Sequence, residues 1–258
     1  FDSTFTDIAG NYSLQLPAGN YTVAAEKEGY RVMFSGNTSD PYFAQSVLLD
    51  SGQTINVDLA LPSIKNTGLS VSGILIDSVY GTPINKGVVV VRKGTHTPTL
   101  LKPNLLSADS SVYAGFVRSD GRYNINVEDS TYYFVQGYSD YFLPTYYNNQ
   151  NATSVFWQNA DSVFINQTTA NKNLYLERDS SYGGGGAYGS ITLPFLEAQE
   201  LDGITVLAKS ITNNHLYSYN FGKEDGEFNI NNLPYGSYQL VAQKVGYPNA
   251  VSEIFTIS

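Results

Sequence analysis

Two histidines, His96 and His215, are the only imidazole side chains in the chain. A Ser-His-Asp triad or a histidine metal site needs partner residues that converge on the ring. The two histidines lie in different copies of the repeat described below, and neither belongs to a recognisable motif. The sequence also has no Gly-x-Ser-x-Gly, His-Glu-x-x-His or phosphate-loop pattern. We therefore interpret both histidines as surface-loop residues, expect no catalytic residue and no cofactor, and predict that the chain is not an enzyme.

One turn near the C-terminal end carries three carboxylates, Glu224, Asp225 and Glu227, around Gly226. Calcium is bound by about six to eight oxygens at about 2.3–2.6 Å, which is more than this turn supplies. Asp225 and Glu227 are thus only weak metal candidates, and we expect a solvated hairpin turn without a metal. The glycine-rich residues 183–186 precede no Lys-Ser/Thr pair and are interpreted as a linker.

Aromatic residues concentrate between residues 132 and 157. Exposed rings stack on sugars or anchor protein interfaces, whereas alternating rings fill the core of a sandwich. The aromatics after residue 140 fall in an insertion between expected strands, so we predict that they form a contact surface for a glycan or a surface protein. They are Tyr141, Phe142, Tyr146, Tyr147, Phe156 and Trp157.

The elements that must position these residues follow a pattern that occurs three times. Residues 9–16 and 225–233 both begin with a glycine turn and an aromatic residue, continue with alternating apolar residues and lead into Leu-Pro-x-Gly. A weaker copy, residues 119–125, lies between them and lacks Leu-Pro-x-Gly. Internal repeats of this kind indicate tandem modules of one fold.

Each part of the pattern predicts a local structure. The first glycine suits a hairpin turn with positive φ, and the alternating residues place one apolar face on a strand. Leu-Pro-x-Gly reverses the chain, and its glycine is expected to take the left-handed conformation. Tyr21 and Tyr238 then begin the returning strand, and their hydroxyls are expected to bond nearby backbone as in a tyrosine corner. The weak copy has Tyr132 after its turn.

The middle copy has the fullest motif. It runs Val71-x-Gly73, Asp77, Gly81-x-Pro83-Ile84, Gly87-Val88-Val89-Val90-Val91 and Ser119-Asp120-Gly121-x-Tyr123. This pattern resembles the carboxypeptidase regulatory-like domain, a transthyretin-like (prealbumin-like) seven-stranded sandwich related in fold to the B-type repeats of bacterial collagen-binding adhesins. The resemblance covers most of the chain and implies a fold more than a task. Members of the family serve as stalks, spacers and assembly modules of secreted and surface proteins.

The B-type repeats often carry an internal Lys–Asn isopeptide bond. The resemblance implies Lys86 or Lys93 joined to Asn173, since these residues lie near the first and last strands of the middle copy. Nothing in the spacing requires the bond. An intact mass lower by one ammonia would reveal it.

The expected fold class is all-β, with three transthyretin-like (Ig-like) antiparallel β-sandwich modules in a row. The first module, residues 1–62, starts at its glycine turn and is expected to lack its first strands. The middle module, residues 63–179, is full and has long insertions, and the third, residues 187–258, shows no last strand. A sandwich without an edge strand exposes unpaired backbone and an open core, so the ends are expected to take strands from elsewhere.

Composition narrows the partners and the location. The net charge of −9 repels nucleic acid and anionic membranes, and no stretch has the roughly 20 apolar residues of a membrane span. The chain has no cysteine and few charges, which favours an extracellular or cell-surface location.

Three functions fit these observations. We favour a non-enzymatic extracellular structural protein, a surface stalk or filament subunit that binds copies of itself head to tail by β-strand complementation. The second is a glycan- or protein-binding adhesin module that uses the aromatic insertion. The third is an accessory stalk of a larger secreted enzyme or outer-membrane protein.

Overall fold

The computed structural model describes residues 2–95, 112–180, 182–192, 204–222 and 225–258. His96, Glu224 and most of the insertion near residues 95–113 lie outside the described residues. The described part is all-β and contains no α-helix, only the 3-10 helices η1 (Pro41–Phe43) and η2 (Trp157–Asn159). The predicted all-β class, with several antiparallel sheets, is confirmed.

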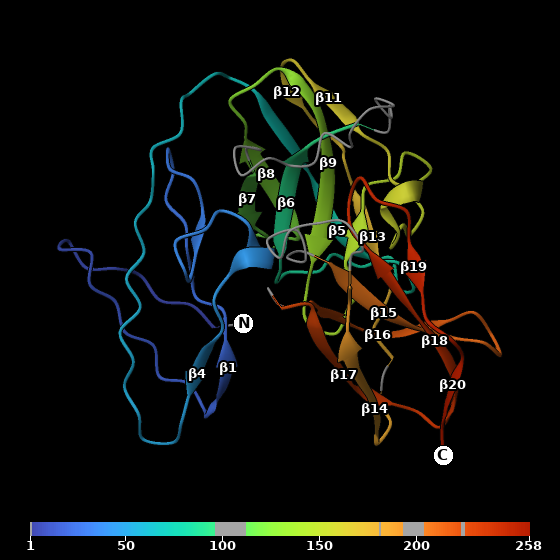
Figure 1. Cartoon of the computed structure of the whole chain (residues 1–258). Coiled ribbons are helices and arrows are strands. Elements are labelled where there is room, and N and C mark those ends of the chain that lie inside the picture. Colours follow the sequence, from blue (N-terminus) through green and yellow to red (C-terminus); the bar gives the residue numbers. More distant parts are fainter. Residues whose placement is uncertain (1, 96–111, 181, 193–203, 223–224) are drawn as a thin grey trace.

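One sheet of the middle module is built around a central strand (Figure 1). This strand pairs antiparallel on one edge, and on the other edge it pairs parallel with the strands that close the module. The sheet consists of β5 (Ser70–Asp77) at the centre, β8 (Arg122–Asn126), β12 (Thr168–Thr169) and β13 (Leu174–Leu176).

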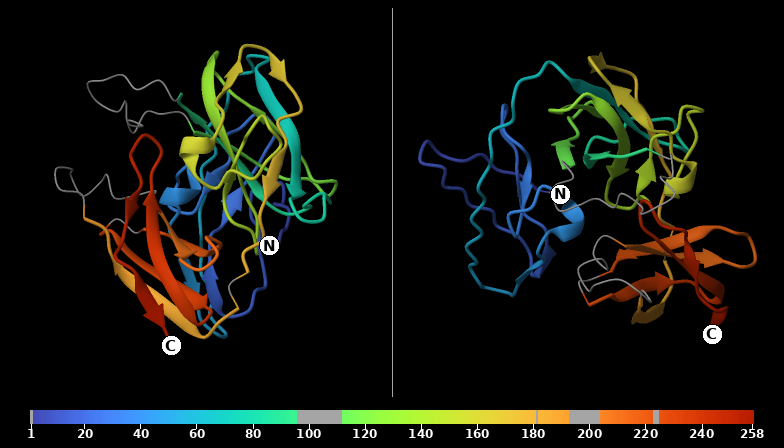
Figure 2. Two further views of the ribbon diagram at one scale, coloured as in Figure 1. Left: turned by 90° about the vertical axis from the view of Figure 1, so that its right-hand side faces the viewer. Right: turned by 45° about the horizontal axis from the view of Figure 1, so that its top comes forward.

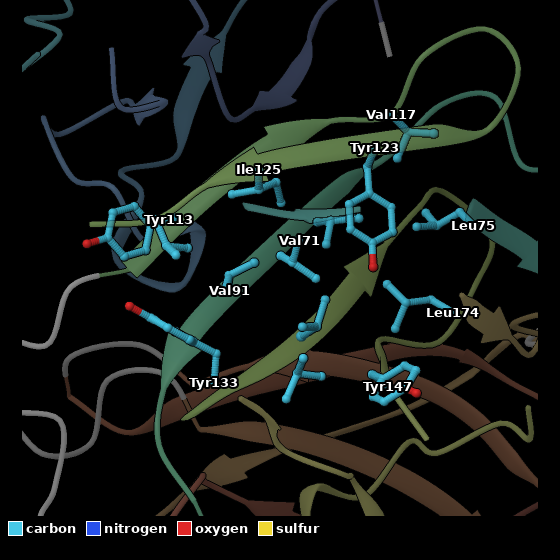
Figure 3. Packing of buried hydrophobic residues seen from close by; sticks show 14 of the residues in the cluster. Val71, Leu75, Val91, Tyr113, Val117, Tyr123, Ile125, Tyr133, Tyr147 and Leu174 are labelled. Atoms are coloured by element: carbon cyan, nitrogen blue, oxygen red, sulfur yellow. The ribbon is translucent and has the colours of Figure 1, made fainter. Parts of the chain in front are cut away.

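The second sheet of the middle module faces the first across the main core. Its strands are β7 (Val112–Phe116), β6 (Val88–Lys93), β9 (Thr131–Tyr138), β10 (Thr145–Tyr146) and β11 (Val163–Ile165), all paired antiparallel. Figure 3 shows Val71 and Leu75 of β5, Tyr123 of β8 and Leu174 of β13 gathered in this core with Val91 of β6. Alternate residues of each strand supply it, as the period of two predicts.

β6 differs from the other strands because consecutive residues are buried on both of its faces. Val89 and Val91 point into the main core, and Val88 and Val90 pack outward against the first module. An uninterrupted apolar run is typical of a strand covered on both sides. The four valines therefore mark a contact between modules as well as a strand.

The third module repeats the two-sheet arrangement (Figure 2). One sheet pairs β14 (Gly185–Ser190) with β17 (Glu227–Leu233). The other contains β16 (Leu216–Phe221), β15 (Thr205–Ser210), β18 (Gly236–Gln243), β19 (Ala250–Val251) and β20 (Phe255–Ile257). Its core is centred on Val206, Ile230, Leu233 and Tyr238.

The first module has the fewest paired strands. β1 (Gly19–Tyr21) pairs with β4 (Val47–Leu49), and β2 (Ala24–Ala25) pairs with β3 (Met33–Phe34). Residues 11–16 were expected as a strand, and burial alternates both there and in residues 55–61, but neither segment joins a β-ladder among the described residues. The sequence pattern is right about which side chains point inward, and wrong about the pairing, because no neighbouring strand lies between them.

The tyrosine corners predicted for the first and third modules are confirmed. The Tyr21 hydroxyl donates to the Pro17 carbonyl at 2.7 Å, and the Tyr238 hydroxyl donates to the Pro234 carbonyl at 2.8 Å. Both bonds span four residues and close the Leu-Pro-x-Gly reversal. Tyr21 ends the pairing of β1 with β4, and Tyr238 ends the pairing of β18 with β20. In both modules the next pairing, of β2 with β3 or of β18 with β19, begins three residues later.

The middle module also has a tyrosine corner, which the sequence pattern did not predict. Tyr133, not Tyr132, donates to a carbonyl four residues earlier, that of Asp129, at 2.9 Å. Tyr132 is 46 % exposed and lies against Phe164, with ring centroids 4.9 Å apart. The middle copy lacks Leu-Pro-x-Gly, so the sequence offers no fixed offset from which to count.

The glycines divide into two groups. Gly10, Gly121 and Gly226 take φ values of 88°, 82° and 79°, as the hairpin-turn prediction requires. Gly19 of Leu-Pro-x-Gly does not have positive φ, so that prediction is wrong for the first copy, whereas Gly236 has φ 155°. Each begins a strand, and the corner tyrosine two residues later folds back over it.

Candidate functional site

The predicted aromatic contact surface is mostly inside the molecule. Tyr146, Tyr147 and Phe142 are 3 %, 7 % and 9 % exposed. Phe142 and Tyr147 belong to the main core, and Tyr146 lies in a smaller cluster with Phe134. The contacts that the structure describes for these rings are thus within the chain.

Trp157 and Phe156 instead face the third module. The indole N–H of Trp157 donates to the Tyr247 carbonyl at 3.1 Å, and its ring meets Phe134 edge-on. Phe156 packs against the apolar cluster that the two modules share. Of the six predicted residues Tyr141 alone is highly exposed, at 79 % with φ 67°. Contact with an outside partner stays a prediction, and Tyr141 is the ring best placed for it.

The middle and third modules share a mixed apolar and polar interface. Leu143 and Val155 of the middle module pack against Leu207 and Leu216 of the third. Gln243 reaches across and donates to the Val155 carbonyl at 2.8 Å. The side chain of Gln243 is buried, so its hydrogen bonds orient the two modules specifically.

The first and middle modules meet at the outward face of β6 and β7. Val32 and Phe34 are 3 % and 2 % exposed and pack on Val88, Val90 and Val112. The third module contacts the same sheet further along, where Val245 joins the cluster around β9 and β10. Both end modules therefore cover one face of one sheet of the middle module.

A buried ion pair ties the first module to this face. Arg92 at the end of β6 is 2 % exposed and Asp40 is 5 % exposed. The guanidinium donates to both carboxylate oxygens, with Nη2 2.7 Å from Oδ1. A bidentate pair of this kind fixes the angle as well as the distance between its partners.

A second charged contact lies nearer the surface. Glu128 accepts the backbone N–H of Lys65 at 2.9 Å and pairs with Arg31, whose guanidinium lies 4.9 Å from the Tyr113 ring centroid. The Lys65 N–H and the Arg31 charge together hold the pKa of Glu128 below its usual value. The carboxylate thus stabilises the junction in its charged form.

A cavity of about 390 Å³ opens between the same two modules. Tyr30, 39 % exposed, lines it, with the Lys27 ammonium 5.0 Å from the ring centroid. Glu26 reaches the Phe116 N–H at 3.3 Å, and partial loss of solvent raises the pKa of Glu26. A tyrosine ring among charged and amide groups can hold a polar neutral ligand by stacking and hydrogen bonds.

His215 has two partners that sequence reasoning missed. Its Nε2 is 2.7 Å from the Ser180 Oγ, and its Nδ1 is 3.3 Å from a Glu177 carboxylate oxygen. This is the order of a Ser-His-Glu triad, but acyl transfer also needs oxyanion donors and a substrate cleft. None of the three residues lines the cavity between the first and middle modules. What the contacts do is fasten residues 177–180, which precede β14, to the third module, and neither Glu177 nor Ser180 belonged to a motif that could have revealed them.

The acidic turn and the Lys–Asn bond gain no support. Asp225 uses its carboxylate to accept the N–H of Glu227 at 2.9 Å, and the described residues contain no group of three His, Cys, Asp or Glu side chains placed for a metal. Asn173 accepts the Ile74 N–H at 3.1 Å, and Lys93 pairs with Asp129. Both side chains of the Lys93–Asn173 pair are thus engaged with other partners.

The feature that most distinguishes the first module is a missing ladder between two extended segments. The Tyr12 hydroxyl donates to the Val57 carbonyl at 2.6 Å, which links residues 11–16 to residues 55–61. No backbone hydrogen bond joins the two segments among the described residues. We call this pair of extended segments without a shared ladder the open strand position.

Comparisons with known proteins add little. No protein-family model matches the chain, and no curated protein matches it. Among solved structures, a streptococcal ancillary pilin is 13 % identical over 94 % of this chain and 72 % of that chain, with a TM-score of 0.27. The shaft pilin SpaA from Lactobacillus rhamnosus GG is 11 % identical over 70 % of this chain and 91 % of that chain, at 0.27.

The Bacillus anthracis TIE protein is 13 % identical over 98 % of this chain, with a TM-score of 0.26. This chain spans 41 % of that protein. Two of these three neighbours are pilins by their names, but at these scores the likeness carries no argument about function. The described residues contain no helix long and apolar enough to span a membrane.

Proposed function

We propose that the chain is a non-enzymatic structural protein of the bacterial cell surface, organised as modules of residues 1–62, 63–179 and 187–258. Its proposed partners are copies of itself, joined head to tail by an added β-strand. The observation that carries the proposal is the open strand position of the first module. The absence of cysteine, the acidic charge and the carboxypeptidase regulatory-like motif support an extracellular location.

The physical argument is the cost of leaving the position open. Leu14, Leu16 and Leu59 are half-buried, so their apolar surface is available to a further strand. Unpaired strand edges next to apolar side chains readily add a strand from another chain. A contact that uses different surfaces on the two copies does not close on itself and propagates into a filament.

The test is assembly of the purified chain at rising concentration, followed by sedimentation and electron microscopy. Rods or filaments that lengthen with concentration are expected. Leu14→Asp places a charge on the inward face and is expected to abolish them, whereas Gln15→Asp places the same charge on the exposed face and is expected to leave them intact. Monomers at every concentration would overturn the proposal of self-assembly.

A second candidate, an adhesin that binds glycan, is favoured by the cavity that Tyr30 lines. Replacement of Tyr30 by alanine is expected to abolish binding on a glycan array, while alanine at the exposed Tyr188 serves as a control. Equal binding by both variants would exclude this cavity as the site.

A further inference from the structure

The joint between the first and middle modules is made by side chains rather than by a shared sheet. Among the described residues no β-ladder contains strands of both modules. Val32 and Phe34 pack on the outward face of β6 and β7, and the buried Asp40 carboxylate pairs with the buried Arg92 guanidinium. The joint can therefore part and form again without breaking a β-ladder of either module.

A single short segment of chain crosses this joint (Figure 1). The Ile64 N–H donates to the Gly29 carbonyl of the first module at 2.9 Å. Five residues later, the Leu69 carbonyl accepts the Val127 N–H of the middle module at 3.0 Å. Residues 65–68 between them are exposed, and we call them the hinge. A segment of this length reaches at most about 18 Å, so the hinge keeps the two modules of one chain in direct contact.

The hinge turns at Gly68, which has φ 72°. Nothing lies within 4 Å of a Cβ at Gly68, so the turn needs glycine for its backbone angle and not for space. The Asn66 Oδ1 accepts the Gly68 N–H at 3.3 Å, and the Thr67 hydroxyl donates to the Val127 carbonyl at 2.7 Å. A short hinge in a restricted conformation favours exchange of a whole element between two copies of a chain.

We propose that the face of β6 and β7 accepts the first module of a second copy of this chain in place of its own. The hinge extends, and Asp40 of one copy pairs with Arg92 of the other. The buried guanidinium of Arg92 selects this occupant, because a partner without a matching carboxylate would leave the charge buried and unpaired.

The closed chain and the exchanged dimer contain the same joints, so the hinge and the chain concentration decide between them. Reciprocal exchange satisfies both joints and gives a dimer. The surface used is separate from the open strand position of the first module. The inference therefore goes beyond the proposed function and does not depend on strand addition.

Complementary charge reversals test the exchange directly. Asp40→Arg in one chain and Arg92→Asp in another leave each chain with two like charges in its own joint. Only exchange between the two chains places an arginine opposite an aspartate in both joints. We expect native mass spectrometry of an equal mixture to show a heterodimer at least about a hundredfold more abundant than the homodimer of either chain, because like charges buried together are strongly disfavoured.

The hinge supplies a second test in the chain with its natural charges. Gly68→Val disfavours the closed turn and is expected to tighten dimerisation at least about tenfold, since positive φ is costly for residues other than glycine. Gly52→Val is the matched control, because Gly52 has φ 77° and nothing lies within 4 Å of its Cβ, but it lies within the first module. It is expected to leave the balance of monomer and dimer unchanged in sedimentation equilibrium.

Each outcome decides a separate point. A mixture of the charge-reversed chains that stays monomeric would overturn the exchange. Equal dimerisation of the two glycine variants would also overturn it, and this comparison decides the matter if a charge-reversed chain does not fold. Leu14→Asp is expected to abolish filaments and to leave the heterodimer intact. A heterodimer without filaments thus supports exchange alone, and filaments without a heterodimer support strand addition alone.

Discussion

The first and middle modules use the same pattern of side chains with opposite results. Tyr123 is 2 % exposed, and its counterpart Tyr12 is 38 % exposed. Leu174 is 0 % exposed, and its counterpart Leu59 is half-buried. The difference is the strand β5, which lies between the two flanking segments in the middle module and has no described counterpart in the first.

This difference shows that the side-chain pattern alone does not bury a core. Alternating apolar residues decide which face points inward, but burial depends on the neighbouring strand that covers them. Because the stabilisation is about 25 cal/mol per Å² of apolar surface buried, the same leucine is worth more in the middle module than in the first. Five substitutions or conditions test this contrast.

The largest effect is expected for Gly73→Val. Gly73 lies on β5 opposite Tyr123, whose hydroxyl donates to the Lys172 carbonyl. The Cβ overlaps the backbone of Lys172, which cannot move without separating β5 from β13. We expect loss of folding of the middle module, measured as the absence of a cooperative urea transition. Gly184→Val is the control, because nothing lies within 4 Å of a Cβ there. A stable Gly73→Val protein would mean that the hydrogen bond from Tyr123 to the Lys172 carbonyl is dispensable.

Asp40→Ala is expected to cost about 3–5 kcal/mol, since it leaves a buried guanidinium without its carboxylate. The double substitution of Asp40 and Arg92 by leucine is expected to recover much of this loss. Urea denaturation measures both. A cost below about 1 kcal/mol for Asp40→Ala would mean that the first module detaches from the middle module in solution.

Leu174→Ala and Leu59→Ala compare equivalent positions directly. Removal of the fully buried Leu174 is expected to cost about 2–5 kcal/mol. Removal of the half-buried Leu59 is expected to cost about 1 kcal/mol or less. If the two losses prove equal in thermal melts of the monomer, residues 55–61 are already covered in solution, and the contrast between the modules is broken.

The two bridging hydroxyls offer a smaller version of the same comparison. Tyr123→Phe leaves the Lys172 carbonyl without its buried donor and is expected to cost about 1–2 kcal/mol. Tyr12→Phe is expected to cost a few tenths of a kcal/mol, because water replaces the donor at an exposed site. Melting curves of the two variants measure both losses, and equal losses would mean that the Tyr12 hydroxyl is shielded from water as well as the Tyr123 hydroxyl is.

The smallest effect is a pH dependence of the junction between the two modules. The pKa of Glu128 is lowered in the folded chain, so its contribution is complete above the ordinary value of 4.5 and is lost as the pH falls through the folded value. The melting temperature should therefore fall on acidification, and by less in Glu128→Gln. An identical acid dependence in both proteins would remove this contact from the junction.

The sequence allowed the prediction of the parts with local causes. The glycine turns follow from positive φ at Gly10, Gly121 and Gly226, and the corners at Tyr21 and Tyr238 follow from a fixed offset after Leu-Pro. No corner was predicted in the middle module because that offset is absent. Burial direction was also predictable, since it depends only on alternation.

The contacts between modules were not predictable, because they join residues with no common motif. Asp40 and Arg92 are 52 residues apart, and Trp157 and Tyr247 are 90 apart. Aromatics that seemed available to a ligand proved to be packed inside the chain. The run from Val88 to Arg92 was the one available signal, since a strand buried on one face only would have alternated.

The packing of both end modules on one face of the β6–β9 sheet has a mechanical consequence. In the filament proposed above, tension that enters through the first module and leaves through the third would act on their contacts with the middle module as well as on the central sandwich. Those contacts, anchored by Arg92 on one side and by Gln243 on the other, are expected to yield first. The chain would then lengthen at low force while the sandwich of the middle module stays folded. The two interfaces would re-form when the force is removed.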